Sequence, residues 1–189
     1  MIYRNIFIIF LFSSYCQMFE SFLYWEDIEK EKQNTILKSK EVNIDVRKTY
    51  FRTFSPSDDE KTANLLNTLS KLHHNDEIKA LYFYVFNNIL KIADGALTEL
   101  FRDPCVNILI SNSEYVIFYL QEKPKLLEKY ALVLGYEFYF KEEGTSDLEY
   151  DYSTFKKIIN NEIKNNKDLQ KTFSILCYEI EEVKRYMKD

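Results

Sequence analysis

The scarcity of glycine and proline limits the folds open to this chain more than any other feature of its sequence. Only three glycines and three prolines occur among 189 residues. An all-β domain needs a tight turn after nearly every strand, and such turns depend on glycine, proline and Asn-Gly pairs. With 46% apolar and 29% charged residues, the composition is that of a folded globular protein. We therefore expect helices joined by polar loops.

The three prolines occupy positions typical of helix starts. Ser55-Pro56 and Asp103-Pro104 each combine an N-cap residue with proline at the first helical position, where the missing N–H is not needed. Pro124 opens a third segment with apolar residues at helical spacing. The agreement of all three prolines strengthens the prediction of an all-α fold.

Apolar side chains at three- and four-residue spacing mark the individual helices. A stripe at 78–92 follows Asn75 and predicts a central helix that is covered on most sides. Ser57 and Glu60 form an alternative capping box for the helix before it. The last helix, at 169–187, has the alternating spacing of a helix that packs lengthwise against another.

The N-terminal part of the folded chain is harder to interpret. A first helix is expected at 20–40. Val42, Ile44 and Val46 then alternate with polar residues, the period-two pattern of a strand. A single strand has no partner here, so this segment is either an extended connector or a helix.

These patterns together predict an all-α fold at 17–189, an irregular bundle of about seven helices in one domain. The short helices expected between residues 101 and 140 could also stack as solenoid-like pairs.

The N-terminus has the layout of a secretory signal peptide. Arg4 supplies positive charge, residues 6–12 form an uncharged apolar run, and small serines follow. That run is shorter than the roughly 20 residues that a membrane-spanning helix needs. Ser14 and Cys16 occupy the small-residue positions of a cleavage site, which predicts a signal peptide at 1–16 and a mature N-terminus at Gln17. The sequence therefore predicts an exported protein, periplasmic or secreted.

Two other fates of this segment stay open. Cys16 could be acylated as the first residue of an envelope lipoprotein, although the bulky Tyr15 before it disfavours that processing. A retained leader would instead anchor the protein, with the aromatic residues at 19–25 at the membrane interface. We favour the interpretation that these aromatic residues cover the helical core.

No motif in the sequence predicts catalysis or a bound cofactor. His73 and His74 are adjacent, so on a helix they would point about 100° apart and could not readily share a metal ion. Asp147, Glu149 and Asp151 alternate like calcium ligands, but the later glycine and glutamate of an EF-hand loop are missing. Phosphate-binding loops, serine elbows and zinc-protease motifs do not occur in the sequence. We expect no catalytic residues, no cofactor and no metal ion.

Removal of the leader would leave Cys105 and Cys177 as an even pair of cysteines. In an exported protein they could form a disulfide that ties the last helix to the segment after Pro104 and adds roughly 4 kcal/mol of stability. Alternatively, both are buried free thiols that act as small apolar side chains. The sequence leaves both interpretations open.

Charge and missing motifs together indicate a binding role. The chain has 25 basic and 30 acidic side chains, a net charge of −5, and lacks the clustered basic surface that nucleic acid requires. We therefore expect a helical module that binds another protein without catalysis, for example an immunity or inhibitor protein. The alternatives are an envelope-associated structural or lipid-anchored protein, and an enzyme with a dispersed carboxylate or metal site.

Overall fold

The computed structural model describes residues 22–140 and 150–186, and these residues form an all-α structure without strands. This confirms the all-α prediction, although the helices in these two ranges are more numerous than the seven expected. The elements in chain order are η1 (Trp25–Asp27), α2 (Lys30–Lys38), α3 (Ile44–Tyr50), α4 (Glu60–Ser70), α5 (Asp76–Ile92), α6 (Gly95–Glu99), α7 (Arg102–Ser111), α8 (Ser113–Leu120), α9 (Pro124–Tyr139), α10 (Tyr152–Glu162) and α11 (Lys167–Tyr186).

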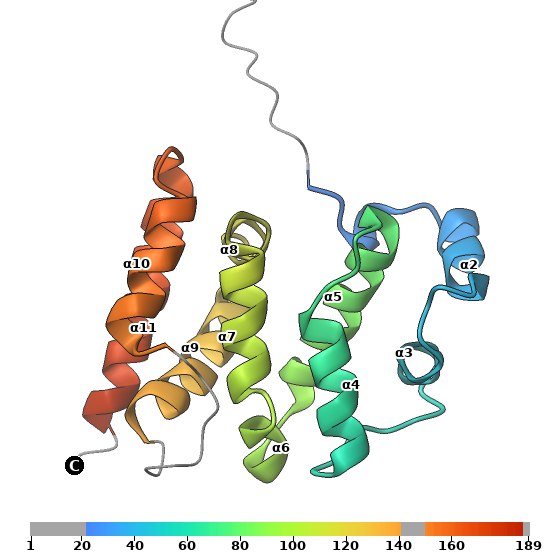
Figure 1. The fold of residues 1–189 in the computed structure, drawn as a ribbon, viewed down its shortest axis with the longest axis horizontal. Coiled ribbons are helices and arrows are strands. Elements are labelled where there is room, and N and C mark those ends of the chain that lie inside the picture. The colour runs from blue at the N-terminus through green and yellow to red at the C-terminus, as the bar shows by residue number, and fades with distance from the viewer. Residues whose placement is uncertain (1–21, 141–149, 187–189) are drawn as a thin grey trace, which may run out of the picture.

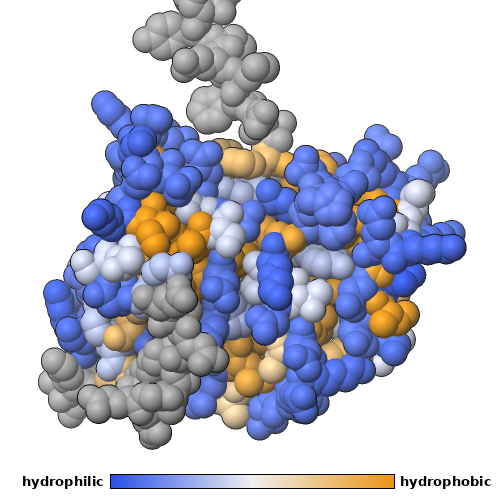
Figure 2. Space-filling model, in the orientation of Figure 1, coloured by the Kyte–Doolittle hydropathy of each residue, from blue (hydrophilic) through white to orange (hydrophobic). Residues whose placement is uncertain are grey.

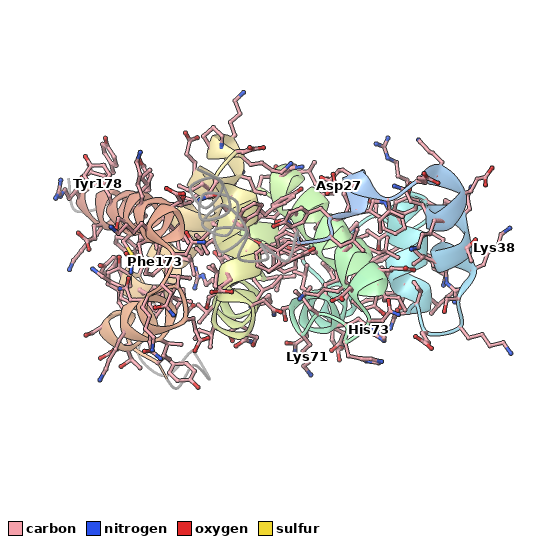
Figure 3. The ribbon with its side chains drawn as sticks, turned by 90° about the horizontal axis from the view of Figure 1, so that it is seen from above. Asp27, Lys38, Lys71, His73, Phe173 and Tyr178 are labelled. Atoms are coloured by element: carbon pink, nitrogen blue, oxygen red, sulfur yellow. The ribbon has the colours of Figure 1, made fainter. Side chains whose placement is uncertain are left out.

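The helices follow one another along the longest axis of the molecule, from α2 and α3 at one end to α10 and α11 at the other (Figure 1). Contacts between α4 and α7 and between α7 and α10 form one layer. A second layer lies behind it, where α5 contacts α9 and α9 contacts α11 (Figure 3). α8 packs against helices of both layers.

A continuous apolar core runs between the two layers, and large rings fill much of it. This explains the aromatic-rich composition, because each buried ring removes 150–250 Å² of surface from water. The fully buried aromatic side chains are Phe83, Phe86, Phe101, Tyr130, Phe155 and Phe173. Phe173 points inward from α11, whereas Tyr178 on the same helix points outward (Figure 3).

The aromatic segment that begins at Phe22 covers the core, as the sequence indicated. Phe22 and Leu23 pack against the core and Trp25 is only 2% exposed. The predicted signal peptide at 1–16, the cleavage site at Cys16 and Gln17, and Phe19 lie outside the described residues.

Two of the predicted helix starts are confirmed and two are wrong. Asn75 caps α5 by accepting hydrogen bonds from the backbone N–H groups of the first turn, and Pro124 is the first residue of α9. Asp59 caps α4, because its Oδ1 accepts a hydrogen bond from the N–H of Thr62 at 2.7 Å, so neither Ser55-Pro56 nor Ser57 is the N-cap. Helix α7 begins one residue before Asp103 and therefore is not capped by it.

The predictions for residues 20–46 need correction. The single helix expected at 20–40 is the short turn η1 followed by α2, which ends at Lys38. The strand-like pattern belongs to the start of α3, whose N-cap Asn43 accepts a hydrogen bond from the N–H of Asp45. Val42 and Val46 are buried, whereas Ile44 is 54% exposed. The buried side chains are therefore four residues apart, as on a helix, and not two residues apart, as on a strand.

The C-terminal helices agree with the sequence pattern. α10 and α11 are separate helices, and the apolar residues of α11 pack lengthwise against α9. The face of the molecule seen in Figure 2 is mostly hydrophilic, and one of its hydrophobic patches lies over α3.

Candidate binding groove

A surface groove lies between the end of α3 and the outer face of α5. Its volume is about 750 Å³, within the range of ligand-binding pockets. Three other surface hollows are smaller, at about 350, 320 and 240 Å³. The residues that line the groove are Thr49, Tyr50, Arg52, Phe54, Ser55, Pro56, Tyr84, Val85, Asn88, Ile89, Lys91 and Ile92.

The first wall of the groove is formed by the way α3 ends. The backbone N–H of Thr53 donates to the carbonyl of Lys48 at 2.8 Å, and that of Arg52 donates to the carbonyl of Thr49 at 3.0 Å. This pair of bonds is a Schellman motif, which reverses the chain after a helix. The connection to α4 then follows this reversal along the groove.

Arg52 occupies the position of this motif that requires a left-handed backbone, with φ of 57°. Glycine is the usual residue there, because a side chain in this conformation crowds the following carbonyl. Arg52 is exposed and lines the groove. The reversal therefore presents an arginine side chain at a strained backbone position.

The second wall is the outer face of α5. Tyr84, Asn88 and Ile92 are spaced at four residues and so lie on one face of that helix. Val85 and Ile89 are buried beside them and form the floor. Ile92 is 70% exposed, so this amphipathic helix leaves an apolar side chain uncovered at its C-terminal end.

Aromatic rings give the groove a rigid lining. The rings of Tyr50, Trp25 and Tyr84 contact one another, with centroids 5.7 Å apart for Tyr50 and Trp25, 6.1 Å for Tyr50 and Tyr84, and 6.4 Å for Trp25 and Tyr84. Phe51 packs edge-on against Tyr50 at 5.3 Å and is 58% exposed. Rings held in this way offer a large apolar contact area without further ordering.

The charge of the groove differs from that of the chain as a whole. Arg52 and Lys91 line it and none of its lining residues is acidic, although the net charge is −5. Nearby cations are already paired, because Lys48 and Lys61 lie 3.7 and 3.3 Å from Asp45. Within the described ranges, Arg52 and Lys91 form no salt bridge.

The smaller hollows contain cations that are engaged within the protein. In the 350 Å³ hollow, Lys129 donates to the carbonyl of Ala93 at 3.1 Å and Arg102 lies 3.9 Å from Glu99. In the 240 Å³ hollow, Lys123 lies 3.9 Å from a carboxylate oxygen of Glu26 and over the ring of Tyr119 at 4.2 Å. In the 320 Å³ hollow, the cation is Lys61, already paired with Asp45. In the groove, Lys91 donates a long hydrogen bond to Oδ1 of Asn88 at 3.4 Å, whereas the side chain of Arg52 forms no hydrogen bond or salt bridge within the described residues. Arg52 is therefore the cation most available to a ligand.

Tyrosine hydroxyls bind the N-terminal segment to α8. Tyr24 donates to the carbonyl of Tyr115 at 3.0 Å, and Tyr115 donates to the carbonyl of Leu23 at 2.9 Å. Tyr119 donates to a carboxylate oxygen of Glu26 at 2.7 Å. Burial is the main reason that the pKa values of Tyr24, Tyr115 and Tyr119 are raised. We assign this cluster a structural role.

The two histidines lie in the connection between α4 and α5, just beyond the end of α4. Their rings contact each other, with centroids 4.1 Å apart. The pKa of His73 is lowered, mainly by partial burial and to a smaller extent by the nearby His74. Throughout residues 22–140 and 150–186, no three His, Cys, Asp or Glu side chains are grouped so as to hold a metal ion.

Asp151, the one described member of the alternating acidic residues, caps α10. Its Oδ1 accepts a hydrogen bond from the N–H of Thr154 at 2.7 Å, and this bond lowers the pKa of the carboxyl group. Asp147 and Glu149 lie outside the described residues.

Cys105 and Cys177 form no disulfide in the structure. Both cysteines are buried free thiols, Cys105 in α7 and Cys177 in α11. Burial raises the pKa of both thiols. They therefore act as small apolar side chains of the core, which is the alternative that the sequence left open.

The groove residues were not recognised from the sequence. The apolar spacing assigns Tyr84 and Ile92 to the helix that follows Asn75, and the sequence predicts an extended connector or a helix before a helix start at Ser55-Pro56. A clue was present in the clustering of rings and cations in "RKTYFRTF" at 47–54, since aromatic residues and arginine are enriched in protein interfaces.

No protein-family model, no curated protein and no solved structure matches the chain. None of the helices in the described part of the chain has the length and apolar character needed to span a membrane.

Proposed function

We propose that the chain is a helical protein-binding module and that the α3–α5 groove holds a segment of its partner. The observation that carries this proposal is the groove itself, with aromatic walls, an apolar floor and exposed apolar side chains at its rim. Tyrosine and arginine are the residues that most often dominate binding energy at protein interfaces.

The exposed side chains at the rim support a protein segment as the ligand. Ile92, which lines the groove, is 70% exposed, and Phe51, the residue after the lining residue Tyr50 in the sequence, is 58% exposed. A partner that covered them would remove apolar surface from water, which stabilises the complex by about 25 cal/mol per Å². The two walls come from elements that the core holds in place, so the groove needs little reorganisation before binding.

The stacking of helices supports the same proposal. We infer that the two layers form solenoid-like helix pairs, as the sequence between residues 101 and 140 allowed. Stacked helices of this kind commonly present extended surfaces to protein partners.

The test is a quantitative pull-down from the native source with two matched variants. Ile92→Asp places a charge in the groove, whereas Ile175→Asp changes an apolar side chain of α11 that is also exposed, at 47%. We expect a partner that is recovered equally by the wild type and Ile175→Asp and is reduced at least about tenfold with Ile92→Asp.

Circular dichroism and thermal unfolding of both variants provide the control for folding. Equal recovery of every bound protein by all three forms would contradict the groove as the binding site. Recovery of no specific protein by the wild type would contradict the binding function.

We further propose that the protein is exported by cleavage of a signal peptide at 1–16 and acts as an immunity or inhibitor protein. Intact mass and N-terminal sequencing of the natural protein test the first part, with Gln17 as the expected first residue. A lipid on Cys16 or an uncleaved chain would instead support the envelope-associated alternative. The identity of the protein recovered in the pull-down tests the second part.

A further inference from the structure

We infer that the groove selects a protein segment in which an Asp or Glu side chain stands next to apolar side chains, and that Arg52 and Lys91 bind its carboxylate. This inference rests on the proposed function and specifies the chemistry of the partner. Arg52 comes from the reversal after α3 and Lys91 from α5, so the two cations belong to opposite walls of one groove.

The groove is locally cationic, although the protein as a whole is acidic. Its lining contains Arg52 and Lys91 and no carboxylate, and neither cation forms a salt bridge in the described residues. Two acidic side chains near Arg52 in the sequence are occupied elsewhere, because Asp45 pairs with two lysines and Asp59 caps α4. Asp58 and Asp94 lie closer in the sequence to Arg52 and Lys91, but neither lines the groove. A partner carboxylate would therefore meet attraction without competition from these groups.

Arg52 supplies an independent argument, because its backbone conformation favours glycine. An exposed arginine at φ of 57° leaves the backbone strained without packing into the core. Strained backbone positions concentrate where a side chain serves binding or catalysis. The strain at Arg52 is accounted for if its guanidinium binds a ligand, since the guanidinium fork matches a carboxylate geometrically.

The other side chains that line the groove indicate which residues should stand beside the acidic residue of the partner segment. Tyr50 and Tyr84 form the aromatic wall, and Ile92 lies next to Lys91 in sequence at the end of α5. Because Ile92 is exposed, an apolar side chain beside the bound carboxylate would cover it. The ligand is therefore an acidic segment with neighbouring aromatic or aliphatic residues, rather than a run of acidic residues alone.

The test uses two synthetic peptide arrays and the full chain. In the first array, Asp or Glu residues alternate with aromatic and aliphatic residues. In the second array, Asn or Gln replaces every acidic residue. We expect peptides of the first array to bind, and their amide counterparts to bind at least about tenfold more weakly, because the amides carry no charge for the two cations.

Substitutions of the two cations make the test specific. Arg52→Gly and Lys91→Gln should each weaken binding of the best acidic peptide about threefold, and the double variant about tenfold. Lys157→Gln, at an exposed position on α10, should leave binding unchanged. Arg52→Gly should also raise the unfolding temperature, because glycine relieves the strained backbone, so its weaker binding cannot result from unfolding.

The outcomes separate this inference from the proposed function. Equal binding of acidic and amide peptides, combined with loss of binding in Ile92→Asp, would overturn the charge selection and leave the groove as a binding site. Binding of no peptide, with an unaffected pull-down by Ile92→Asp, would overturn both. The same binding assay is also run with oligothymidylate, a single-stranded DNA. Tighter binding of this DNA than of any acidic peptide would overturn the inference in favour of a nucleic acid.

Discussion

A buried, hydrogen-bonded polar pair joins two central helices, α5 and α9. The hydroxyl of Tyr130 on α9 donates to Oδ1 of Asn87 on α5 at 3.0 Å, and Nδ2 of Asn87 donates to the carbonyl of Phe83 at 2.9 Å. Both side chains are at most 1% exposed. The pair is stable because each polar atom has a partner inside the core.

Removing the hydroxyl of Tyr130 should destabilise the protein more than its small size suggests. Tyr130→Phe leaves Oδ1 of Asn87 buried without its donor, which costs about 1–3 kcal/mol of unfolding free energy. The control is the double variant Tyr130→Phe with Asn87→Leu, which replaces both polar partners and should recover part of that loss. Urea unfolding measures both values. A double variant less stable than Tyr130→Phe would contradict the proposed cause.

At the residue scale, sequence reasoning identifies chemistry that depends on local spacing and misses chemistry that depends on the fold. The groove joins residues 49–56 to 84–92, which no short pattern connects. The left-handed conformation of Arg52 could not be predicted either, because glycine is the usual signal for that position and it is absent here. Both features arise from how α3 and α5 pack.

The two core cysteines should be unreactive until the protein unfolds. Cys105 is fully buried and Cys177 is 8% exposed, so an attacking reagent reaches them only after local or global opening. In a Cys16→Ser chain, reaction with a chromogenic disulfide reagent should be at least about 100-fold slower under native conditions than in urea. Two thiols should titrate in urea without reductant, whereas none would show that a disulfide had formed.

At the scale of single helices, the sequence predicts a start correctly where the cap residue also begins the apolar pattern. Asn75 does so and caps α5. Ser55-Pro56 looks equally favourable, yet Asp59 forms the stronger carboxylate cap and Ser57 donates its hydroxyl to Asp59. The helix therefore begins four residues later than predicted, with Asp59 instead of Ser55 as its N-cap. Ser55 and Pro56 belong to the connection between α3 and α4 and line the groove.

The strand-like pattern at 42–46 shows why short alternations are ambiguous. Val42 and Val46 are separated by four residues, a spacing that places side chains on the same face of a helix and also of a strand. Only the intermediate residue distinguishes the two structures. Ile44 is apolar, which favours a strand in the sequence, but the helix exposes it.

The close packing of α9 against α11 depends on a glycine in α9. A Cβ atom at position 135 would lie 2.7 Å from Cβ and Cγ1 of Val183, closer than packed carbon atoms approach one another. Gly135→Ala should therefore destabilise the protein by about 1–3 kcal/mol, despite the higher helix propensity of alanine.

The companion substitution distinguishes crowding from any other effect of the alanine. Val183→Ala removes the two γ-methyl groups that the new Cβ would meet and keeps Cβ of residue 183, so the loss of stability in the double variant should be smaller than the sum of the two single losses. Denaturant unfolding of the three variants measures this coupling. Strictly additive effects would show that the two positions do not press against each other.

At the scale of the whole molecule, the sequence predicts the class of fold but not the arrangement of its layers. Helical spacing and scarce glycine suffice for the all-α prediction, because both are local properties of the chain. The contacts of α4 with α7 and of α5 with α9 join helices that are not consecutive. Such pairings depend on the shapes of complementary faces, which spacing alone does not specify.

The tyrosines connect this architecture to its response to pH. Burial is the largest cause of the raised pKa values of Tyr24, Tyr115, Tyr119, Tyr130 and Tyr152. They come from the N-terminal segment and from α8, α9 and α10, so the effect is spread along the molecule. In the unfolded chain these hydroxyls would ionise near the ordinary tyrosine value of about 10.

These shifts predict cooperative unfolding in alkali. Below about pH 10 the hydroxyls are protonated in both states, and their contribution to stability is fully present. Above that pH the unfolded chain releases protons that the folded protein retains, so the unfolding free energy falls by about 1.4 kcal/mol per pH unit for each retained proton. The part of the absorbance change at 295 nm that comes from the buried tyrosines should therefore coincide with the loss of the far-ultraviolet circular dichroism signal, and both should recover at pH 8. Tyr130→Phe should reduce the slope, since it removes a fully buried hydroxyl. Ionisation of all the tyrosines near pH 10 with helicity intact would contradict the prediction.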